Sequence, residues 1–363
     1  MGESDKIRVG IVGAGGVARR VHAPGLRLIP GVEIVAAADP SPEAAASLGA
    51  AAVYADHRAM LAEASPDAVV ISSPNYLHHS ITLDAFEAGA HVLCEKPLAL
   101  NAAEAEEMLA AAERSGRAHM TAFTYGFMPA AVRLRQLIEE GELGKIRTVR
   151  GAYLMAASPH QRGWRSEKRL AGSGALGDLG SHLIHLALRC AGSIARLTAL
   201  ERSFSDSPSS DVDDWIGFLA EFSGGACGTF EIARMCPGRG TDMSETMTLE
   251  IYGTRGGAVL SMDDPLALRV ALGEAGADPK RPLERVEVPD GLIKPSGSPR
   301  GPAAEDPRWG YRYDQAWRFI EAARGRAAPD PSFEDGLRCQ QVLDAVQTSS
   351  ASGGWEMVPR GSG

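Results

Sequence analysis

The chain has 363 residues, which predicts two domains, and its apolar, charged and aromatic fractions are typical of a globular protein. A formal net charge of −9 without a basic patch argues against a nucleic-acid partner, and no apolar run is long enough to span a membrane. Five cysteines without a Cys-x-x-Cys pair, and an N-terminus without a signal-peptide pattern, favour a cytoplasmic protein with reduced thiols and no structural metal site.

The first predicted element is a β-branched strand over residues 7–12, followed by a glycine-rich turn and a helix. The turn reads Gly13-Ala14-Gly15-Gly16-Val17-Ala18. In such a unit the first glycine permits the tight turn, the second lets the backbone approach a pyrophosphate, and a small residue at position 18 lets the helix pack on the strand. The phosphates then meet free N–H groups at the start of the helix. We therefore predict cofactor contacts from Gly13, Gly15, Gly16, Val17 and Ala18.

The second predicted strand, residues 33–38, ends in Asp39 at the spacing expected for a carboxylate that binds the adenosine ribose. A carboxylate accepts hydrogen bonds from a 2′-hydroxyl but repels a 2′-phosphate. The next residues, Pro40 and Ser41, supply no arginine for that phosphate. Asp39 therefore favours NAD over NADP.

Helices and strands continue to alternate, which predicts a parallel, doubly wound sheet in a domain over residues 1–124. The further predicted helices span residues 43–48, 60–63, 81–88 and 102–115, and the further strands span residues 68–72, 91–94 and 118–123. After the strand at 68–72, a loop carries Ser73, Pro74, Asn75 and His78 at the edge where such sheets bind ligands. These four residues are candidate cofactor contacts, although a helix-capping turn explains the loop equally well and is compatible with that role.

The strand at 91–94 stops at Glu95-Lys96-Pro97. Proline has no backbone N–H, so the strand cannot continue inside the sheet, and the Lys96–Pro97 bond is a candidate cis bond. Glu95 and Lys96 are thereby held at the ligand-binding edge of the sheet. A lysine that merely ends a strand is the alternative.

Beyond residue 125 the pattern changes to strands in succession, which indicates an antiparallel or mixed sheet in a domain over residues 125–356. The predicted strands span residues 146–155, 197–204, 215–222, 226–233, 247–252 and 257–261, and the predicted helices span residues 132–139, 312–323 and 333–347. Residues 273–309 are rich in Pro and Gly and are predicted to be a surface excursion. Residues 357–363 resemble the remnant of a protease-cleavage site, and we exclude them from the fold prediction.

A second glycine-rich turn, at residues 172–177, leads into a predicted helix that carries Asp178, His182 and His185. Positions 178 and 182 are four residues apart, so a carboxylate and an imidazole project from one face of an α-helix. An aspartate that caps the helix and a histidine buried in the core are the alternative. Trp164 and Arg165 precede the turn, and they and Tyr125 are candidate pocket residues, although surface packing explains them equally well.

Taken together, the motifs resemble the glucose–fructose oxidoreductase / inositol dehydrogenase / rhizopine-catabolism (Gfo/Idh/MocA) family over nearly the whole chain. The motifs are Gly13-x-Gly15-Gly16, Ser73-Pro74-Asn75-x-x-His78, Glu95-Lys96-Pro97 and Asp178-x-x-x-His182. The resemblance implies an N-terminal Rossmann domain and a C-terminal α/β domain with an open, mainly antiparallel sheet. It also implies a homodimer or homotetramer formed through that sheet.

The resemblance implies that Lys96, Asp178 and His182 are catalytic and that the substrate is a small polyhydroxylated compound such as a sugar, an aminosugar or a cyclitol. The same three residues, with Tyr125, Trp164, Arg165 and His185, are then the candidate substrate contacts. Two positions depart from the family pattern: His185 stands where aspartate is frequent, and Ser173 stands where glycine is frequent. Both affect the expected substrate pocket.

The expected reaction is hydride transfer between a nicotinamide and a secondary alcohol or ketone. His182 suits the role of base because its unperturbed pKa lies near neutrality, and Lys96 suits a hydrogen bond to the reacting oxygen. Asp178 would orient the hydroxyl or the lysine. Two alternatives remain: a redox-neutral sugar conversion with internally recycled NAD, and an NAD-binding sensor without turnover.

Overall fold

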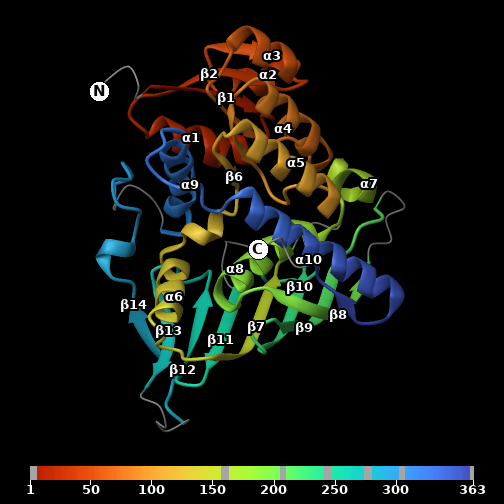
Figure 1. Cartoon of the computed structure of the whole chain (residues 1–363), viewed down its shortest axis with the longest axis vertical. Coiled ribbons are helices and arrows are strands. Elements are labelled where there is room, and N and C mark those ends of the chain that lie inside the picture. The colour runs from red at the N-terminus through yellow and green to blue at the C-terminus, as the bar shows by residue number, and fades with distance from the viewer. Residues whose placement is uncertain are drawn as a thin grey trace. The chain divides into compact units, whose positions relative to one another are not determined.

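The computed structural model describes residues 6–156, 163–204, 210–240, 247–273, 280–301 and 307–359. The chain forms two compact units, drawn in Figure 1. The first contains Met1–Thr124 and Lys294–Leu337, and the second contains Tyr125–Ile293 and Arg338–Gly363. Each unit has a sheet of its own.

The first unit is built on a six-stranded sheet in the order β3-β2-β1-β4-β5-β6, with every pair parallel. The strands are β1 (Ile7–Val12), β2 (Val32–Ala38), β3 (Ala52–Tyr54), β4 (Ala68–Ile71), β5 (His91–Cys94) and β6 (His119–Thr121). This is the strand order of a dinucleotide-binding Rossmann fold, so the predicted doubly wound sheet is confirmed. The short edge strand β3 was not among the predicted strands.

Several helices of the first unit begin at a side-chain cap. The clearest is α5, which begins after Asn101, whose side chain accepts the Glu104 N–H at 3.0 Å, and ends before Gly116 at φ 63°. The helices of this unit are α1 (Ala23–Arg27), α2 (Pro42–Ala46), α3 (His57–Ala64), α4 (His78–Glu87), α5 (Ala102–Ser115) and α9 (Pro307–Ala323).

Residues 294–337 belong to the first unit, although the sequence pattern had placed them in the second domain. Helix α9 packs on α1 at Gly25, where an added Cβ would lie 3.3 Å from the Ala316 methyl group and from the Cα of Tyr313. A lack of side chain at position 25 thus lets the two helices approach closely. The sequence gives no local sign of this pairing, because the two helices are separated by almost the whole chain.

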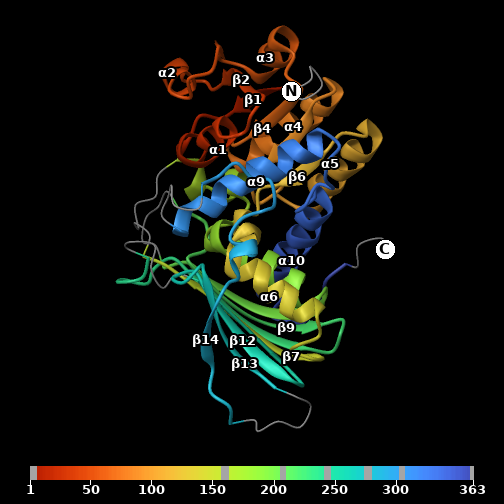
Figure 2. The same cartoon turned by 90° about the vertical axis from the view of Figure 1, so that its left-hand side faces the viewer.

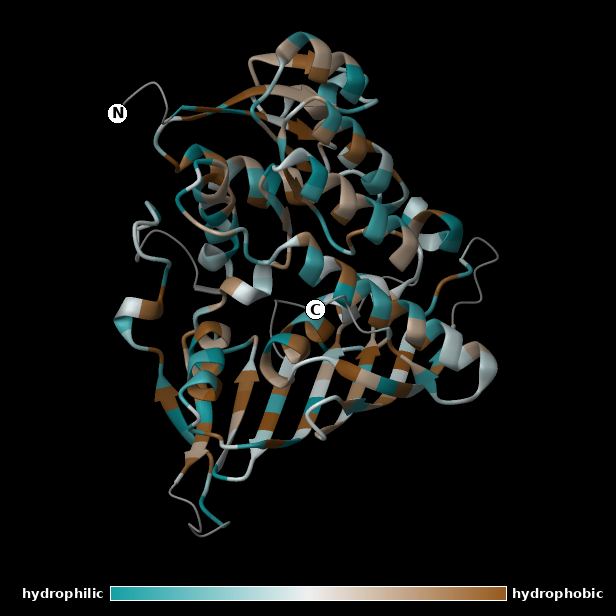
Figure 3. Ribbon diagram, viewed as in Figure 1, coloured by the Kyte–Doolittle hydropathy of each residue, from teal (hydrophilic) through white to brown (hydrophobic). Residues whose placement is uncertain are grey.

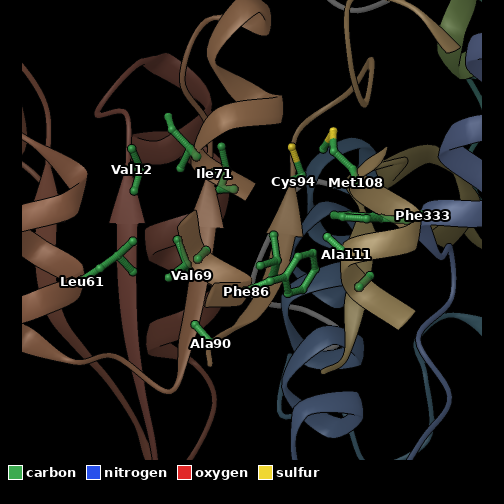
Figure 4. Packing of buried hydrophobic residues seen from close by; sticks show 14 of the residues in the cluster. Val12, Leu61, Val69, Ile71, Phe86, Ala90, Cys94, Met108, Ala111 and Phe333 are labelled. Atoms are coloured by element: carbon green, nitrogen blue, oxygen red, sulfur yellow. The ribbon is translucent and has the colours of Figure 1, made fainter. Parts of the chain in front are cut away.

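Buried aliphatic and aromatic side chains from the sheet and its helices form one core in the first unit. Figure 4 shows Val69 and Ile71 of β4 in this cluster with Phe86 of α4 and Phe333. Phe333 is fully buried, and its ring meets that of Phe86 edge to face with centroids 5.9 Å apart. The start of α10 (Phe333–Ser352) therefore anchors the returning segment in the Rossmann core.

The second unit contains a nine-stranded sheet in the order β14-β13-β12-β11-β7-β10-β9-β8-β15. The strands are β7 (Ile146–Leu154), β8 (Ile194–Arg202), β9 (Trp215–Phe222), β10 (Cys227–Ala233), β11 (Met247–Gly253), β12 (Gly256–Ser261), β13 (Ala267–Leu272), β14 (Glu284–Glu287) and β15 (Glu356–Met357). Among the described strand pairs of this sheet only β7 and β10 run parallel, so the predicted open, mainly antiparallel sheet is confirmed. Strand β14 lies in the stretch that had been predicted to be a surface excursion; residues 274–279 and 302–306 of that stretch lie outside the described part of the chain.

Helices cover one face of this sheet. They are α6 (Pro129–Glu139), α8 (Ser181–Ala191) and the greater part of α10, and α6 and α8 contact the strands directly. The short helix α7 (Lys168–Ala171) belongs to the same unit. Figure 2 shows α6 and α10 on the same side of the strands. Buried and exposed positions alternate along β9 and β10, and the strands of this sheet are accordingly banded in the hydropathy colouring of Figure 3.

The C-terminal residues reach into the second sheet. Met357, the first residue of the range that had been excluded as a tail, pairs with Arg196, and the Val358 N–H donates to the Ala195 carbonyl at 3.0 Å. Residues 360–363 of that range lie outside the described residues. Among the helices that are described, none is both long and apolar enough to cross a membrane.

Candidate active site

The glycine-rich turn after β1 combines a left-handed Gly13 with an open Gly15. Gly13 has φ +87°, and a Cβ there would lie 2.6 Å from the backbone of Ser72 and Ser73. A Cβ on Gly15 would instead meet nothing within 4 Å, and Gly15 is exposed. Ala18 is fully buried. The turn therefore needs Gly13 for its own shape and leaves the backbone at Gly15 open to a ligand, which fits a dinucleotide.

Asp39, at the end of β2, is tied to this turn. Its carboxylate accepts the Ala14 N–H at 2.8 Å and the Ser41 N–H at 2.9 Å. A carboxylate has about four acceptor positions, so two hydrogen bonds leave capacity for a ribose hydroxyl. The predicted ribose contact thus lies beside the predicted pyrophosphate contact, as NAD binding requires.

The Glu95-Lys96-Pro97 segment follows β5 directly, and the Lys96–Pro97 bond is cis. The Lys96 N–H donates to Glu95 Oε2 at 3.2 Å, and Glu95 Oε1 lies 2.9 Å from His22 Nε2. Burial alone would raise the pKa of Glu95, but the hydrogen bond and charge of His22 and the charge of Lys96 outweigh it and lower the pKa. Glu95 is therefore a carboxylate beside Lys96.

His78 joins the two loops that were predicted to contact the cofactor. Its Nδ1 lies 3.0 Å from the Pro97 carbonyl and its Nε2 lies 3.1 Å from the Ser73 carbonyl. The residue is fully buried, and burial lowers its pKa despite these two acceptors. A fully buried ring has no surface for a cofactor, so we infer that His78 holds the loops in place. Asn75, in the same loop, is 8% exposed.

In the second unit, one helical segment carries Asp178, His182 and His185. It begins with a turn of π-helix at Leu176–Gly180 and continues as α8. The predicted helix is present, but the wider turn changes the angle between Asp178 and His182 from that of a regular α-helix. Asp178 is half-buried, whereas His182 is 6% and His185 3% exposed.

Aromatic rings fix the surroundings of His182. The ring of Tyr125 stacks on that of His182 with centroids 4.2 Å apart, and the Tyr125 hydroxyl lies 2.9 Å from the Tyr153 hydroxyl. A Cβ on Gly126 would lie 3.3 Å from His185 Cε1. The structure therefore brings Tyr125, His182 and His185 together in the second unit.

Trp164 and Arg165 lie in a short 3₁₀ turn, Trp164–Ser166, of the second unit. The guanidinium carbon of Arg165 lies 4.3 Å from the centroid of the Trp164 ring. This cation–π contact pairs the two side chains with each other.

Two residues of this site were not found from the sequence. His22 stands 73 positions before its partner Glu95, and Tyr153 stands 28 positions after its partner Tyr125. No local pattern marks either pair, because both depend on how distant elements pack. The described residues contain no group of three His, Cys, Asp or Glu side chains that could hold a metal ion.

Two family profiles match the chain. The profile described as "Oxidoreductase family, NAD-binding Rossmann fold" matches residues 7–123, and the "GFO/IDH/MocA C-terminal domain" matches residues 131–259. Levoglucosan dehydrogenase of Pseudarthrobacter phenanthrenivorans is 32% identical over 363 residues, which cover 92% of this chain and 90% of that protein. D-glucoside 3-dehydrogenase of Escherichia coli is 36% identical over 189 residues, which cover 51% of this chain and 54% of that protein.

Solved structures agree with these matches. Levoglucosan dehydrogenase in complex with NADH and levoglucosan superimposes with a TM-score of 0.88 at 30% identity, over 98% of this chain and 100% of the other. An oxidoreductase domain protein from Kribbella flavida gives a TM-score of 0.87 at 32% identity, over 98% of this chain and 100% of the other.

Proposed function

Because the chain belongs to the Gfo/Idh/MocA family of oxidoreductases, we propose that it oxidises a secondary hydroxyl of a glucose-type sugar with NAD. The observation that most supports this proposal is the similarity to levoglucosan dehydrogenase, which extends over 92% of this chain. The partial similarity to D-glucoside 3-dehydrogenase supports a pyranose ring, and within it the 3-hydroxyl, as the group that is oxidised. Levoglucosan and simple glucosides are therefore the first substrates to test.

Residues of the first unit would hold the cofactor. The N–H groups of the turn at Gly15 and Gly16 would bind the pyrophosphate, and Asp39 would accept a hydrogen bond from the adenosine ribose. Ser73 and Asn75 would line the cofactor from the loop that His78 fixes. The chemistry that NAD supplies when bound is acceptance of a hydride from the carbon that carries the oxidised hydroxyl.

Three candidate residues would act on the substrate. We assign to His182 removal of the hydroxyl proton, because an imidazole titrates near neutrality and its ring is held in place by Tyr125. Lys96 would donate a hydrogen bond to the same oxygen and stabilise its developing negative charge. Asp178 would orient the hydroxyl. In the direction of reduction, His182 would return the proton.

The test is a substrate screen with the purified full chain, followed by absorbance in the reduced-nicotinamide band. The panel contains levoglucosan, methyl glucosides, D-glucose, an aminosugar and a cyclitol, each with NAD and with NADP. We expect NAD reduction with at least one glucose-type sugar, and oxidation at C3 in the isolated product. NAD that binds without reduction by any compound would contradict the proposal, and product analysis would then separate a redox-neutral conversion from a sensor.

We further propose that copies of the chain associate through the uncovered face of the second sheet. This face exposes apolar side chains, among them Leu219, which is 50% exposed. Sedimentation of the wild type and of Leu219→Asp tests this role, since an added charge should dissociate a dimer or tetramer. A wild-type protein that sediments as a monomer would exclude it.

A further inference from the structure

One buried carboxylate holds the start of the helical segment that carries Asp178 and His182. Asp213 is 2% exposed; its Oδ1 accepts the Gly174 N–H at 2.5 Å and its Oδ2 accepts the Leu176 N–H at 2.7 Å. Its backbone carbonyl accepts the Ala175 N–H at 3.0 Å. Three successive N–H groups, which a helix cannot satisfy at its own start, are thus all bound by one residue.

The surroundings of Asp213 are closely packed. The Arg234 guanidinium, 5% exposed, donates to the Asp213 carbonyl at 3.2 Å, and a Cβ on Gly174 would overlap both the Asp213 backbone and this guanidinium. Gly174 therefore lets the turn and Asp213 approach closely, since the Cβ of any other residue type would lie between them. Burial raises the pKa of Asp213, although the two N–H groups and Arg234 oppose this effect. Burying a carboxylate costs free energy, and an ordinary helix cap does not require it, because an exposed Ser or Asn caps a helix equally well.

The N–H groups that Asp213 binds directly precede the candidate catalytic residues in the chain. The helical segment runs without interruption from Leu176 to Ala191, and Asp178 lies two residues after Leu176, the last of the three residues whose N–H groups Asp213 binds. The Asp178 N–H itself donates to the Gly174 carbonyl at 3.0 Å, so the anchored turn also fixes the backbone of the candidate catalytic residue. We propose that Asp213 is a positioning residue that sets the orientation of Asp178 and His182 toward the substrate. This inference rests on the proposed dehydrogenase function.

The test is Asp213→Asn in the full chain. An asparagine offers one acceptor oxygen and turns its NH₂ toward the second N–H, so one anchor is lost at nearly unchanged volume. We expect kcat, normalised to NAD-binding sites, to fall at least about tenfold, because small displacements of reacting groups cost up to roughly a hundredfold. The Kd for NAD should stay within about twofold, since the candidate cofactor contacts lie in the first unit. A residue that only stabilises the fold would change the denaturation midpoint without this kcat effect.

Asp56→Ala is the control that removes an ordinary helix cap. Asp56 caps α3 in the first unit, where its Oδ1 accepts the Arg58 N–H at 2.8 Å and the Ala59 N–H at 3.3 Å. Asp56→Ala removes this cap, which should lower stability and leave kcat unchanged. Equal kcat in the folded Asp213→Asn variant and the wild type would overturn the proposal.

A second variant keeps the test decisive if Asp213→Asn does not fold. Asp213→Ser retains one short acceptor, and the same loss of kcat at unchanged NAD affinity is expected. If neither variant folds, Asp213 serves folding and not placement, and the proposal is wrong. A wild type that reduces no NAD with any sugar would instead refute the proposed function, which is a distinct outcome.

Discussion

The imidazole Nε2 of His22 lies 2.9 Å from the Glu95 carboxylate, and this contact joins the helix after the glycine turn to the residue that precedes Lys96. The His22 side chain has no exposed surface, and that of Glu95 is 12% exposed. The backbone N–H of Lys96 donates to the other oxygen of the same carboxylate at 3.2 Å. His22 thus supports the backbone of a candidate catalytic residue from 74 positions away in the sequence, counted from 22 to 96.

Replacing His22 by Ala should lower the free energy of unfolding by about 1–3 kcal/mol, because the substitution leaves a buried carboxylate without its partner. The measurement is denaturant unfolding near neutral pH. The control is His79→Ala, since His79 lies 2.8 Å from Glu107 in an otherwise similar pair that is 24% and 67% exposed. An exposed pair contributes at most about 1 kcal/mol, so equal losses in the two variants would contradict the assigned importance of burial.

His78 should make stability fall as the pH drops below neutrality. Burial lowers its pKa in the folded state, so the unfolded chain, with a histidine pKa of about 6.5, binds the proton first. The stabilising contribution is therefore complete above about pH 6.5 and is lost as the pH falls toward the lower, folded-state pKa. The slope from one such group is at most about 1.4 kcal/mol per pH unit.

The comparison for His78 is His78→Asn, with unfolding measured between about pH 7.5 and about pH 5.5, one unit on either side of the unfolded histidine pKa. We expect a shallower dependence in the variant. The pKa values of His91 and His119 are also lowered by burial, but these residues are present in both proteins and cancel in the difference. Parallel curves would show that His78 does not carry the effect.

The glycines of the first turn should respond differently to alanine. Gly13→Ala should destabilise the protein by roughly 1–3 kcal/mol, because φ is +87° and the Cβ would press against the Ser72 and Ser73 backbone. Gly15→Ala meets no protein atom within 4 Å, so it should fold normally but bind NAD at least about tenfold more weakly. Thermal unfolding and NAD titration separate the two effects. If the Gly15→Ala protein bound NAD with wild-type affinity, the pyrophosphate would not bind at this turn.

The sequence predicts most of the architecture because its signals are local. Apolar strands followed by glycine turns and capped helices specify the Rossmann order, and the residues at the strand ends, Asp39 and Lys96, are placed by that order alone. The partners of these residues could not be predicted. His22 and Asp213 act through contacts 73 and 39 positions away, and the packing of α9 on α1 joins opposite ends of the chain. Such contacts depend on tertiary packing, which single-sequence patterns do not encode.

Asp39 should determine the preference for NAD. Asp39→Ala removes the carboxylate that lies beside the glycine turn and accepts the Ala14 N–H. A hydrogen bond to a charged group contributes about 1.5–3 kcal/mol, which corresponds to a loss of NAD affinity of roughly ten- to a hundredfold. NADP affinity should not fall in parallel, because the same change removes a repulsive charge. Direct titration of both cofactors is the measurement, and equal losses for NAD and NADP would show that Asp39 shapes the turn without selecting the cofactor.

The catalytic assignments predict a loss of turnover that is separate from cofactor binding. Lys96→Ala and His182→Gln should each lower kcat by about 10²–10⁴, the usual contribution of a positioned acid or base, while NAD still binds. Asp178→Asn should lower kcat as well, since it removes the charge that would orient the hydroxyl. Lys145→Ala, an exposed lysine in the turn before β7, is the matched control and should leave kcat unchanged. A turnover that survives the Lys96 or His182 substitution would remove that residue from the chemistry and leave it a structural role in its unit.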